Sequence, residues 1–546
     1  MKLSRTMNKV TTSTALAMLA VGLIGCAQES TQEQAADSST PEVSETKGGP
    51  PPGYNTEIPE SILTPHDLET RIGTFKYFDG IPTKETAKAI YNHLDYIRGV
   101  ESFLNGMPAA SLEAIRRSQE VNGETHSYQV RIFDQLMDSN PLFLTGNTDT
   151  VYVSAVLDLK KDGPTVIEIP PGTGPGTVND AFFRFVTDTG APGPDKGKGG
   201  KYLILPPDYD GELDPPVGGM EAEVEGQKYF VSKSTSWVNW FIARGFLKDG
   251  EPDYSSKLFR EGLKIYSLAR KTNPPKMEFY NGSRKAFNTI HSTDFNFYEE
   301  LHAVIEREPI DMLEPQLRGV FASIGIQKGK PFAPDERMKE ILTKAAEVAN
   351  ATARTMLWYE RDQSAFLYEG SNWKRGFVGG SYEFLKDEGM GGRNLDARTQ
   401  FFYFATVNTP AMTWKLIGKG SQYAWGYLDA NGDYLDGSKT YKLNLPKDAP
   451  AEKFISIVLY DPQTRSQLQT GQPFPSYNSE KGKGKVAVND DGSVDLYIGP
   501  KAPAGKESNW LQTVPGKGWF CLLRLYSPTE AWFDKTWRPG EIELVN

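Results

Sequence analysis

Short runs of β-branched and aromatic residues, divided by clusters of glycine and proline, place the strongest constraint on the fold of this chain. Four such runs lie at residues 151–159, 165–169, 181–186 and 202–205. Runs of this length and composition, bounded by turn residues, are typical of strands. The pattern therefore predicts a β module in the first half of the chain.

The same pattern returns after about residue 395. Asn431-Gly432 and Asp491-Gly492 separate some of the later runs, and both dipeptides favour the tight turns of β-hairpins. The predicted strands of this second zone are residues 401–406, 441–445, 454–460, 494–498 and 519–526.

Helical spacing of apolar residues separates the two β zones and also precedes the first. Residues 83–121 predict one long helix, and a stripe from Met338 to Tyr359, which steps by alternating four and three residues, predicts another. This second helix is expected to begin just after Pro334, since proline is tolerated in a first helical turn. Residues 254–268 and 295–305 predict two shorter helices.

These patterns together predict an α+β multidomain protein in which two β-sandwich modules, of jelly-roll type, bracket a helical module. The expected boundaries are 57–232 for an N-terminal helix with its β module, 233–394 for the helical module, and 395–546 for the C-terminal β-sandwich. A chain of 546 residues is long enough to bury several hydrophobic cores.

The first 25 residues predict export. Lys2, Arg5 and Lys9 precede an apolar stretch at 15–25, which is shorter than the span of about 20 residues that a transmembrane helix needs. The stretch ends in Leu23-Ile24-Gly25-Cys26, which resembles the lipobox of bacterial lipoproteins. The resemblance implies cleavage before Cys26 and attachment of acyl chains such as palmitate to it; an ordinary secretory signal is the alternative.

Ala27 follows the lipidated residue, and by resemblance to lipoprotein sorting rules this favours the outer membrane of a bacterial envelope, facing the periplasm or the cell surface. The acyl chains would hold a soluble body at that membrane. Residues 26–56 are rich in Gln, Ser, Thr, Glu, Pro and Gly, so they predict a disordered tether.

Charge and cysteine content narrow the partners further. The net charge is −10, and no cluster of Lys and Arg interleaved with aromatics occurs, which argues against nucleic acid as a partner. Once Cys26 is lipidated, Cys521 is left without an internal disulfide partner, and its apolar neighbours predict an inert core residue. The oligomeric state is not defined by these features.

Several short motifs resemble a pair of domain families. The first family is the domain of unknown function numbered 1254, and the second is its usual companion, numbered 1214. The N-terminal motifs are Asn147-Thr148-Asp149-Thr150-Val151-Tyr152, Asp158-Leu159, Gly163-Pro164 and Gly200-Lys201-Tyr202-Leu203; the C-terminal ones are Tyr460-Asp461, Asn489 to Ser493, Asn509-Trp510-Leu511, Arg524-Leu525-Tyr526 and Trp537. The resemblance implies β modules around helices and no established reaction. One departure is Phe454-Ile455-Ser456, where the family often has Trp in the middle.

Familiar catalytic motifs are absent from the sequence. No Gly-x-Ser-x-Gly occurs, so the nucleophile elbow of a serine hydrolase is missing. Glu299 and His302 form half of a di-metal carboxylate motif whose second half is also missing. The sequence therefore predicts no metal site and leaves any cofactor undefined.

The entry to the first β run carries the candidate site. Asp149 and Tyr152 could act as an acid and base pair if neighbouring modules exclude water. Residues predicted to bind the substrate are Asn147, Arg184 and Lys201 from the N-terminal module, and Asn509, Trp510, Arg524 and Tyr526 from the C-terminal module. The alternative interpretation is structural: Asp149 caps a turn, Arg524 pairs with a buried carboxylate and Trp510 is a core aromatic.

Three functions are compatible with these features. The first is an enzyme that acts on a small organic molecule in a cleft between β modules, by acid–base or hydrolytic chemistry. The second is a binding protein for a carbohydrate or another small molecule, and the third is an outer-membrane scaffold. A closed pocket, an open aromatic groove and a large apolar patch would distinguish them.

Overall fold

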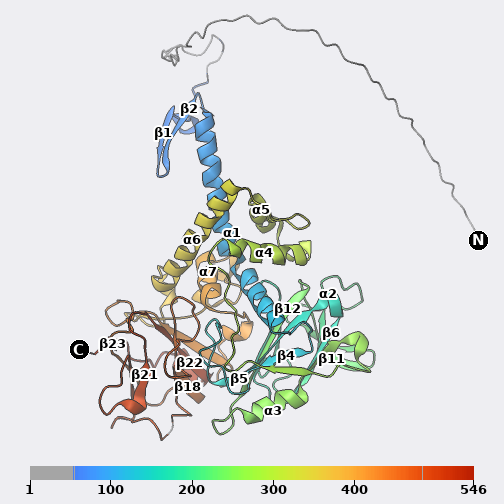
Figure 1. The fold of residues 1–546 in the computed structure, drawn as a ribbon, viewed down its shortest axis with the longest axis vertical. Coiled ribbons are helices and arrows are strands. Elements are labelled where there is room, and N and C mark those ends of the chain that lie inside the picture. The colour runs from blue at the N-terminus through green and yellow to red at the C-terminus, as the bar shows by residue number, and fades with distance from the viewer. Residues whose placement is uncertain (1–52, 54–55, 483, 546) are drawn as a thin grey trace, which may run out of the picture. The chain divides into compact units, whose positions relative to one another are not determined.

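The computed structural model describes residue 53 and residues 56–482 and 484–545 (Figure 1). These residues form a mixed α and β fold, rich in strands, with eight α-helices and 23 strands in five sheets. The mixed, β-rich class predicted from the sequence is confirmed at this level. Residues divide into two compact units, Met1–Ile81 and Pro82–Asn546, and the predicted Cys26 anchor lies outside the described residues.

The described part of the first unit is a small antiparallel hairpin. β1 (Asp67–Thr70) pairs with β2 (Gly73–Phe78), with Asp67 opposite Lys76, and a short strand β3 (Ile81–Pro82) follows in the chain. Phe75 is its buried side chain, and most of the other residues are exposed.

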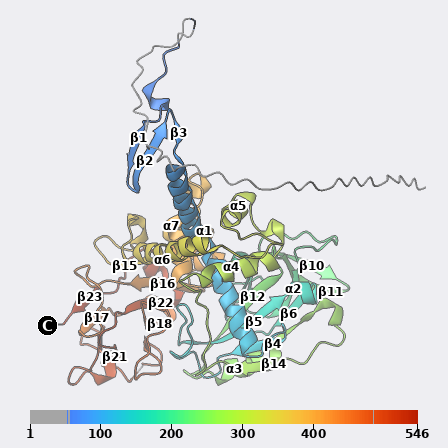
Figure 2. The same ribbon diagram turned by 45° about the horizontal axis from the view of Figure 1, so that its top comes forward.

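A long helix opens the second unit, as predicted. α1 (Lys84–Val121) begins where the Thr83 side chain accepts a hydrogen bond from the Thr86 backbone N–H, which is a standard N-cap. Its buried residues lie mostly from Gly99 onward, whereas the apolar residues Leu94 and Ile97 are 42% and 44% exposed. The helices that pack against α1 are α4 (Asn296–Arg307), α5 (Pro315–Ser323), α6 (Glu336–Trp358) and α7 (Leu395–Phe404) (Figure 2). Among the described residues, no helix has a stretch apolar and long enough for a bilayer span.

Two sheets follow α1 in the chain and share one core. The six-stranded sheet has the order β14 (Glu278–Asn281), β4 (Gln129–Ile132), β5 (Thr150–Asp158), β12 (Val238–Phe246), β7 (Pro175–Asn179) and β8 (Phe185–Gly190). The five-stranded sheet has the order β10 (Met220–Val224), β11 (Gln227–Lys233), β9 (Gly200–Leu205), β6 (Thr165–Ile169) and β13 (Lys264–Ser267). Val153, Phe241, Ile167 and Tyr202 belong to the core between them. Two short helices, α2 (Leu159–Asp162) and α3 (Asp253–Gly262), complete this part.

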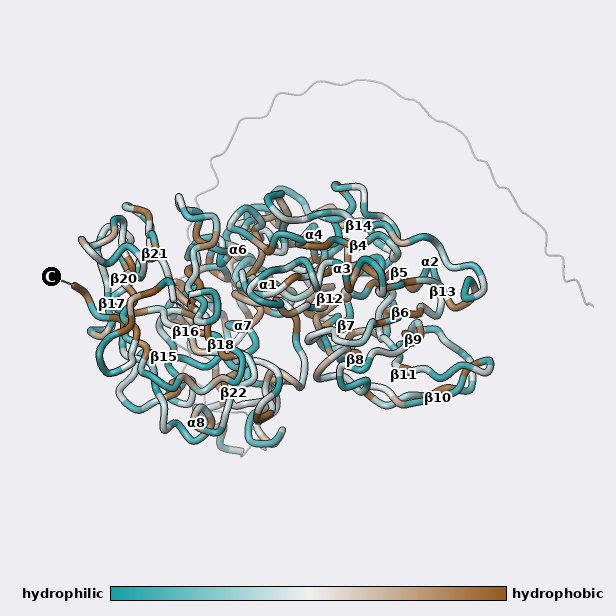
Figure 3. The backbone as a smooth tube through the Cα atoms, turned by 90° about the horizontal axis from the view of Figure 1, so that it is seen from below, coloured by the Kyte–Doolittle hydropathy of each residue, from teal (hydrophilic) through white to brown (hydrophobic). Residues whose placement is uncertain are grey.

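The C-terminal strands also form two sheets around a common core. One has the order β15 (Trp373–Lys374), β16 (Ser421–Gly426), β22 (Phe520–Pro528), β18 (Ala451–Tyr460) and β19 (Ser476–Asn478). The other has the order β21 (Trp510–Gln512), β20 (Val494–Gly499), β17 (Tyr441–Leu445) and β23 (Ile542–Leu544), and α8 (Glu530–Phe533) follows β22. Cys521 is fully buried in this core, as predicted. In Figure 3 the two strand-rich parts lie on either side of α1 and α7.

Three sequence predictions were wrong in detail. The helix expected at 254–268 ends at Gly262, and the chain continues as β13. The strand expected at 181–186 begins only at Phe185, because Asp180 Oδ1 accepts the backbone N–H groups of Phe182 and Arg184 and holds a turn there. The segment 233–394, expected to be helical, also contributes β12, β13, β14 and β15.

The clearest error concerns residues 401–406, predicted as a strand. These residues mostly belong to α7, which the Asn394 side chain caps by accepting the Ala397 N–H. Every residue from Thr399 to Phe404 is buried. A helical segment buried on all sides, like these six residues, has no polar face, so its sequence lacks the period of 3.6 that identifies an amphipathic helix.

Candidate functional site

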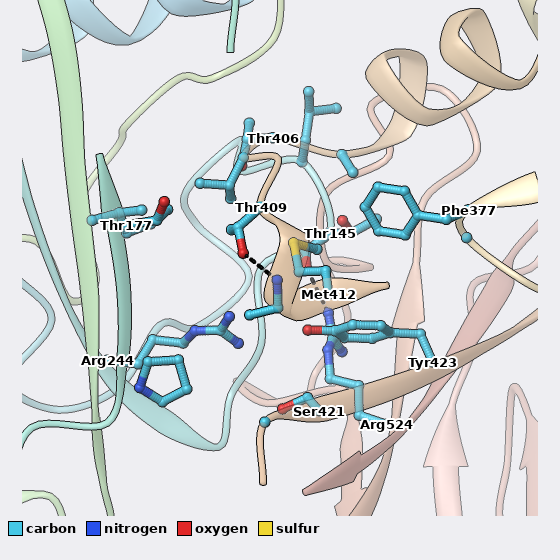
Figure 4. A pocket seen from close by; sticks show the side chains of 18 of the residues that line it. Thr145, Thr177, Arg244, Phe377, Thr406, Thr409, Met412, Ser421, Tyr423 and Arg524 are labelled. Carbon is cyan, nitrogen blue, oxygen red and sulfur yellow. Dashed lines mark hydrogen bonds between the residues drawn. The ribbon is translucent and has the colours of Figure 1, made fainter. Parts of the chain in front are cut away.

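A cavity of about 100 Å³ lies between the six-stranded sheet and the sheet that contains β16 and β22. Residues 405–412, which follow α7, form a third side. All of these elements belong to the second compact unit. Figure 4 shows side chains from the three sides around one space.

The first wall is one face of the six-stranded sheet. Tyr152 of β5 lies opposite Arg244 of β12, and Thr177 of β7 lies between Ile242 of β12 and Asp188 of β8. Successive side chains in a strand point to opposite faces, so residues 242 and 244 share a face and their cross-strand partners project with them. The pairing thereby brings five side chains from four strands to the cavity.

The second wall is one face of the sheet that contains β16 and β22, and alternate residues of these strands line it. Ser421, Tyr423 and Trp425 of β16 line the cavity together with Leu522 and Arg524 of the neighbouring strand β22. In the antiparallel register Tyr423 lies opposite Arg524, and Trp425 lies opposite Leu522. Figure 4 shows Arg524 beside Tyr423 on this wall, with Arg244 extending from the other wall.

Two residues of the lining have unusual backbone conformations. Thr145 has φ 44° and Val407 has φ 62°, and both line the cavity. β-branched residues seldom adopt positive φ, and each such residue costs about 1–3 kcal/mol unless its surroundings impose it. Such strain concentrates at functional sites, so the two residues support a functional role for the cavity.

Three buried polar atoms on residues that line this cavity lack hydrogen-bond partners among the described residues. They are Arg524 Nη1, Trp425 Nε1 and Asp188 Oδ1, and their side chains are 3%, 4% and 7% exposed. The other Arg524 nitrogen, Nη2, donates to the Thr145 carbonyl at 2.5 Å, which fixes the guanidinium. Since buried polar atoms are nearly always paired, three unpaired atoms around one space indicate a place for a ligand or ordered water.

The charges of the cavity are predominantly positive. Within the described residues neither Arg244 nor Arg524 takes part in an ion pair, and the Arg244 guanidinium lies 5.8 Å from the Tyr152 ring centre. The one carboxyl group in the lining belongs to Asp188. Burial raises the pKa of Asp188 to about 7, against the opposing effect of hydrogen bonding, of which the bond from Thr409 is the largest contribution. The Asp188 carboxyl group is therefore poised to exchange a proton near neutral pH.

The polar stretch before β5 is a buried junction between the two strand-rich parts. Asn147 Oδ1 accepts the backbone N–H groups of Asp149 and Thr150, so this side chain shapes the entry to the strand. Asp149 is fully buried and does not line the cavity. Its Oδ1 accepts from Asn478 Nδ2 at 2.9 Å, and Tyr526 donates to its Oδ2 at 3.4 Å.

Tyr526 and Tyr152 thus have different surroundings. Burial first, and the Asp149 carboxylate second, raise the pKa of Tyr526 well above its ordinary value, so Tyr526 keeps its proton. Tyr152 lines the cavity, and its hydroxyl oxygen accepts from Asn147 Nδ2 at 2.7 Å. Its own proton is left free to be donated elsewhere.

The remaining predicted residues lie in other contacts. Arg184 Nε forms an ion pair with Asp180 at 2.6 Å, and Lys201 lies 3.5 Å from Glu168 on the second sheet of this part. Asn509 Nδ2 donates to the carbonyls of Ala487 and Asp495, and Trp510 Nε1 donates to the Gly499 carbonyl. The structure brings Tyr152 and Arg524 to the cavity, and Asn147, Asp149 and Tyr526 to the adjoining junction.

Sequence reasoning missed Asp188, Arg244, Tyr423 and Trp425. Arg244 is a charge in the apolar run Trp240-Phe241-Ile242-Ala243, which was a usable signal. The other three could be found only with the strand pairing in hand. In the described part of the chain, no group of three His, Cys, Asp or Glu side chains is placed to hold a metal ion.

Two known families match the two strand-rich parts of the chain separately. Residues 128–267 match the family described as "Protein of unknown function (DUF1254)", and residues 420–530 match "Protein of unknown function (DUF1214)". The predicted resemblance to both families, in this order, is confirmed. The four strands of the first wall fall in the first match, and β16 and β22 fall in the second.

Two solved structures are similar to the chain. The crystal structure of the VPA0106 protein from Vibrio parahaemolyticus has 17% identity and a TM-score of 0.48, and the match covers 83% of this chain and 100% of that one. An uncharacterised protein from Burkholderia cenocepacia has 11% identity and a TM-score of 0.37, with 84% and 96% covered. No curated protein matches this chain.

We expect Asp149→Asn to destabilise the fold by about 1–3 kcal/mol, because the new amide group would face donors that now meet a carboxylate. Urea unfolding measures the difference in the free energy of unfolding between Asp149→Asn and the wild type. Asp490→Asn, in an exposed loop, is the control and should change the free energy of unfolding by less than about 0.5 kcal/mol. Equal stability of the two variants would show that the Asp149 contacts do not stabilise the junction.

Proposed function

We propose that this protein is an enzyme of the bacterial cell envelope that binds a small organic molecule in the cavity and acts on it by acid–base chemistry. The observation that supports this most directly is that three residues from both strand-rich parts, Asp188, Trp425 and Arg524, line one cavity and each carry an unpaired buried polar atom. Pockets with a few convergent polar groups and a perturbed pKa are typical of active sites.

Asp188 and Tyr152 have complementary properties for this chemistry. Asp188 accepts or releases a proton near pH 7, since burial raises its pKa to about that value. Tyr152 is oriented by Asn147, so its hydroxyl proton is available to a bound molecule. Asp188 thus takes the acid–base role first expected of Asp149, and Asp149 supports the wall through Tyr526.

The cavity also distinguishes this proposal from the alternatives. A carbohydrate-binding protein is expected to present an open aromatic groove and many paired hydrogen-bonding groups. Here the polar groups lie among Phe377, Phe401 and Met412, between two sheets. A binding protein without catalysis would use the same cavity, and the loss of turnover in defined variants separates the two.

A turnover screen tests the proposal. The purified full-length protein is incubated with mixtures of small organic molecules, and consumption is followed by mass spectrometry. We expect compounds that the wild type consumes and that Asp188→Asn and Tyr152→Phe leave largely intact, at least about a hundredfold slower, as is usual when a general acid or base is removed. Consumption at equal rates by all three proteins, or by none of them, would contradict an acid–base enzyme at this cavity.

The protonation of Asp188 predicts a specific pH dependence of stability. The unfolded carboxyl group titrates near 3.8 and the folded one near 7, so between these values the unfolded state alone loses the proton and stability falls as the pH rises. Asp188→Asn has no carboxyl group at this position, so its stability does not fall in this way. Its free energy of unfolding minus that of the wild type should increase by about 2–4 kcal/mol from pH 4 to pH 7.

Urea unfolding at a series of pH values measures this difference for Asp188→Asn. The exposed-loop variant Asp490→Asn serves as the matched control and should track the wild type across the series. A constant offset between Asp188→Asn and wild type at every pH would mean that Asp188 is ionised throughout.

We further propose that Cys26 carries the lipid that anchors the protein. Cells labelled with a palmitate analogue should yield a labelled protein in the membrane fraction, because acyl chains supply the affinity for the bilayer. The variant Cys26→Ser should lose the label and leave the membrane fraction. Label retained on Cys26→Ser would contradict the anchor.

A further inference from the structure

We propose that the ligand of the cavity is a small organic carboxylate, with its carboxylate group held by Arg524, Arg244 and Trp425 and its apolar part against Phe377, Phe401 and Met412. This inference rests on the proposed function, since it names the class of molecule that the cavity takes. Its basis is the hydrogen-bond donors, the charges and the apolar side chains of the cavity lining.

The donors require an acceptor on the ligand. Trp425 Nε1 and Arg524 Nη1 can only donate, and neither has a partner among the described residues. Tyr423 adds a hydroxyl beside Arg524 (Figure 4). A carboxylate offers two oxygens with several acceptor positions, so one group satisfies both donors.

The charges require that the acceptor be anionic. Arg524 is almost fully buried, and in the described part of the chain no ion pair neutralises it or Arg244. A buried charge without a counter-ion is costly, and a bound anion removes that cost. Guanidinium groups match the planar geometry of a carboxylate.

The absence of a side chain at residue 376 leaves the Trp425 donor uncrowded on that side. Gly376 lines the cavity, and a Cβ atom there would lie 2.9 Å from Trp425 Nε1. The φ angle of Gly376 is not in the positive region, so backbone conformation does not call for glycine at this position. Close packing of the residue 376 backbone beside the indole nitrogen is the remaining physical reason, and a larger residue would crowd this donor.

The apolar part of the lining favours an organic anion over an inorganic one. The Phe377 and Phe401 rings lie 4.4 Å apart between centres, and Met412 and Leu522 also line the cavity. A bare phosphate would leave these side chains facing water, whereas a short alkyl or aryl group would bury them. The combination of two cations and an apolar surface fits a carboxylate with a short apolar group.

Isothermal titration calorimetry of the full-length protein tests this inference. The probes are monocarboxylates of three to eight carbon atoms, straight-chain or aromatic, each compared with its neutral amide and with inorganic phosphate. We expect at least one carboxylate to bind ten times more tightly than its amide and than phosphate. Arg524→Met, Arg244→Gln and Gly376→Ala should each weaken its binding about tenfold or more.

The control is Gly319→Ala, on an exposed face of α5 where an added Cβ meets nothing within 4 Å, and it should bind like wild type. Because Arg524→Met also removes the bond to Thr145, Gly376→Ala provides a variant that keeps every charge. Weakened binding in Gly376→Ala alone would still place the carboxylate at Trp425.

The outcomes separate this inference from the proposed function. Tighter binding of phosphate than of any carboxylate, or equal binding of acids and amides, would overturn the carboxylate inference. If Asp188-dependent turnover is then still found, the proposed function stands with another substrate class. Carboxylate binding that all three cavity variants leave unchanged would place it outside the cavity and overturn the inference as well.

Discussion

The stretch from Thr145 to Asp149 carries the hydrogen bonds on which the arrangement of the two strand-rich parts depends. Arg524 donates to the Thr145 carbonyl, Tyr460 donates to the Gly146 carbonyl at 2.8 Å, and Lys481 donates to the Thr148 carbonyl at 3.0 Å. Asn147 to Thr150, the four small polar residues at the start of β5, are buried in this junction. Main-chain groups buried in such a junction must be paired, and here side chains of the C-terminal part pair them.

The cavity follows from this junction and from the alternation of side chains in β22. Cys521, Leu523 and Leu525 point into the C-terminal core, whereas Phe520 and Leu522 belong to the core shared with the helices. Arg524 lies on the same face of β22 as Phe520 and Leu522, and it lines the cavity. One strand therefore contributes to two cores and supplies the cation of the site, so a one-residue shift in register would move Arg524 into the apolar core.

The sequence predicted those features that depend on local patterns. The helix at residues 84–121, the strands β5, β6, β17 and β20, and the burial of Cys521 follow from periodicity and composition. The helix α7 was missed because the burial of every residue from Thr399 to Phe404 removes its amphipathic pattern. Tyr152 and Arg524 were predicted as site residues and line the cavity, whereas Asp188 and Trp425 were not predicted, because only the pairing of distant strands brings them there. Arg244 was also not predicted, although a charge beside an apolar run was a signal for it.

We propose that the cavity binds an organic anion at Arg524 and Trp425. A crystal structure of the protein grown with a monocarboxylate that binds it, at a resolution that places water molecules, tests this most directly. We expect a carboxylate group within hydrogen-bonding distance of Arg524 Nη1 and Trp425 Nε1, with its carbon chain against Phe377 and Phe401. Water molecules alone on these two nitrogen atoms, with the carboxylate bound elsewhere, would contradict it.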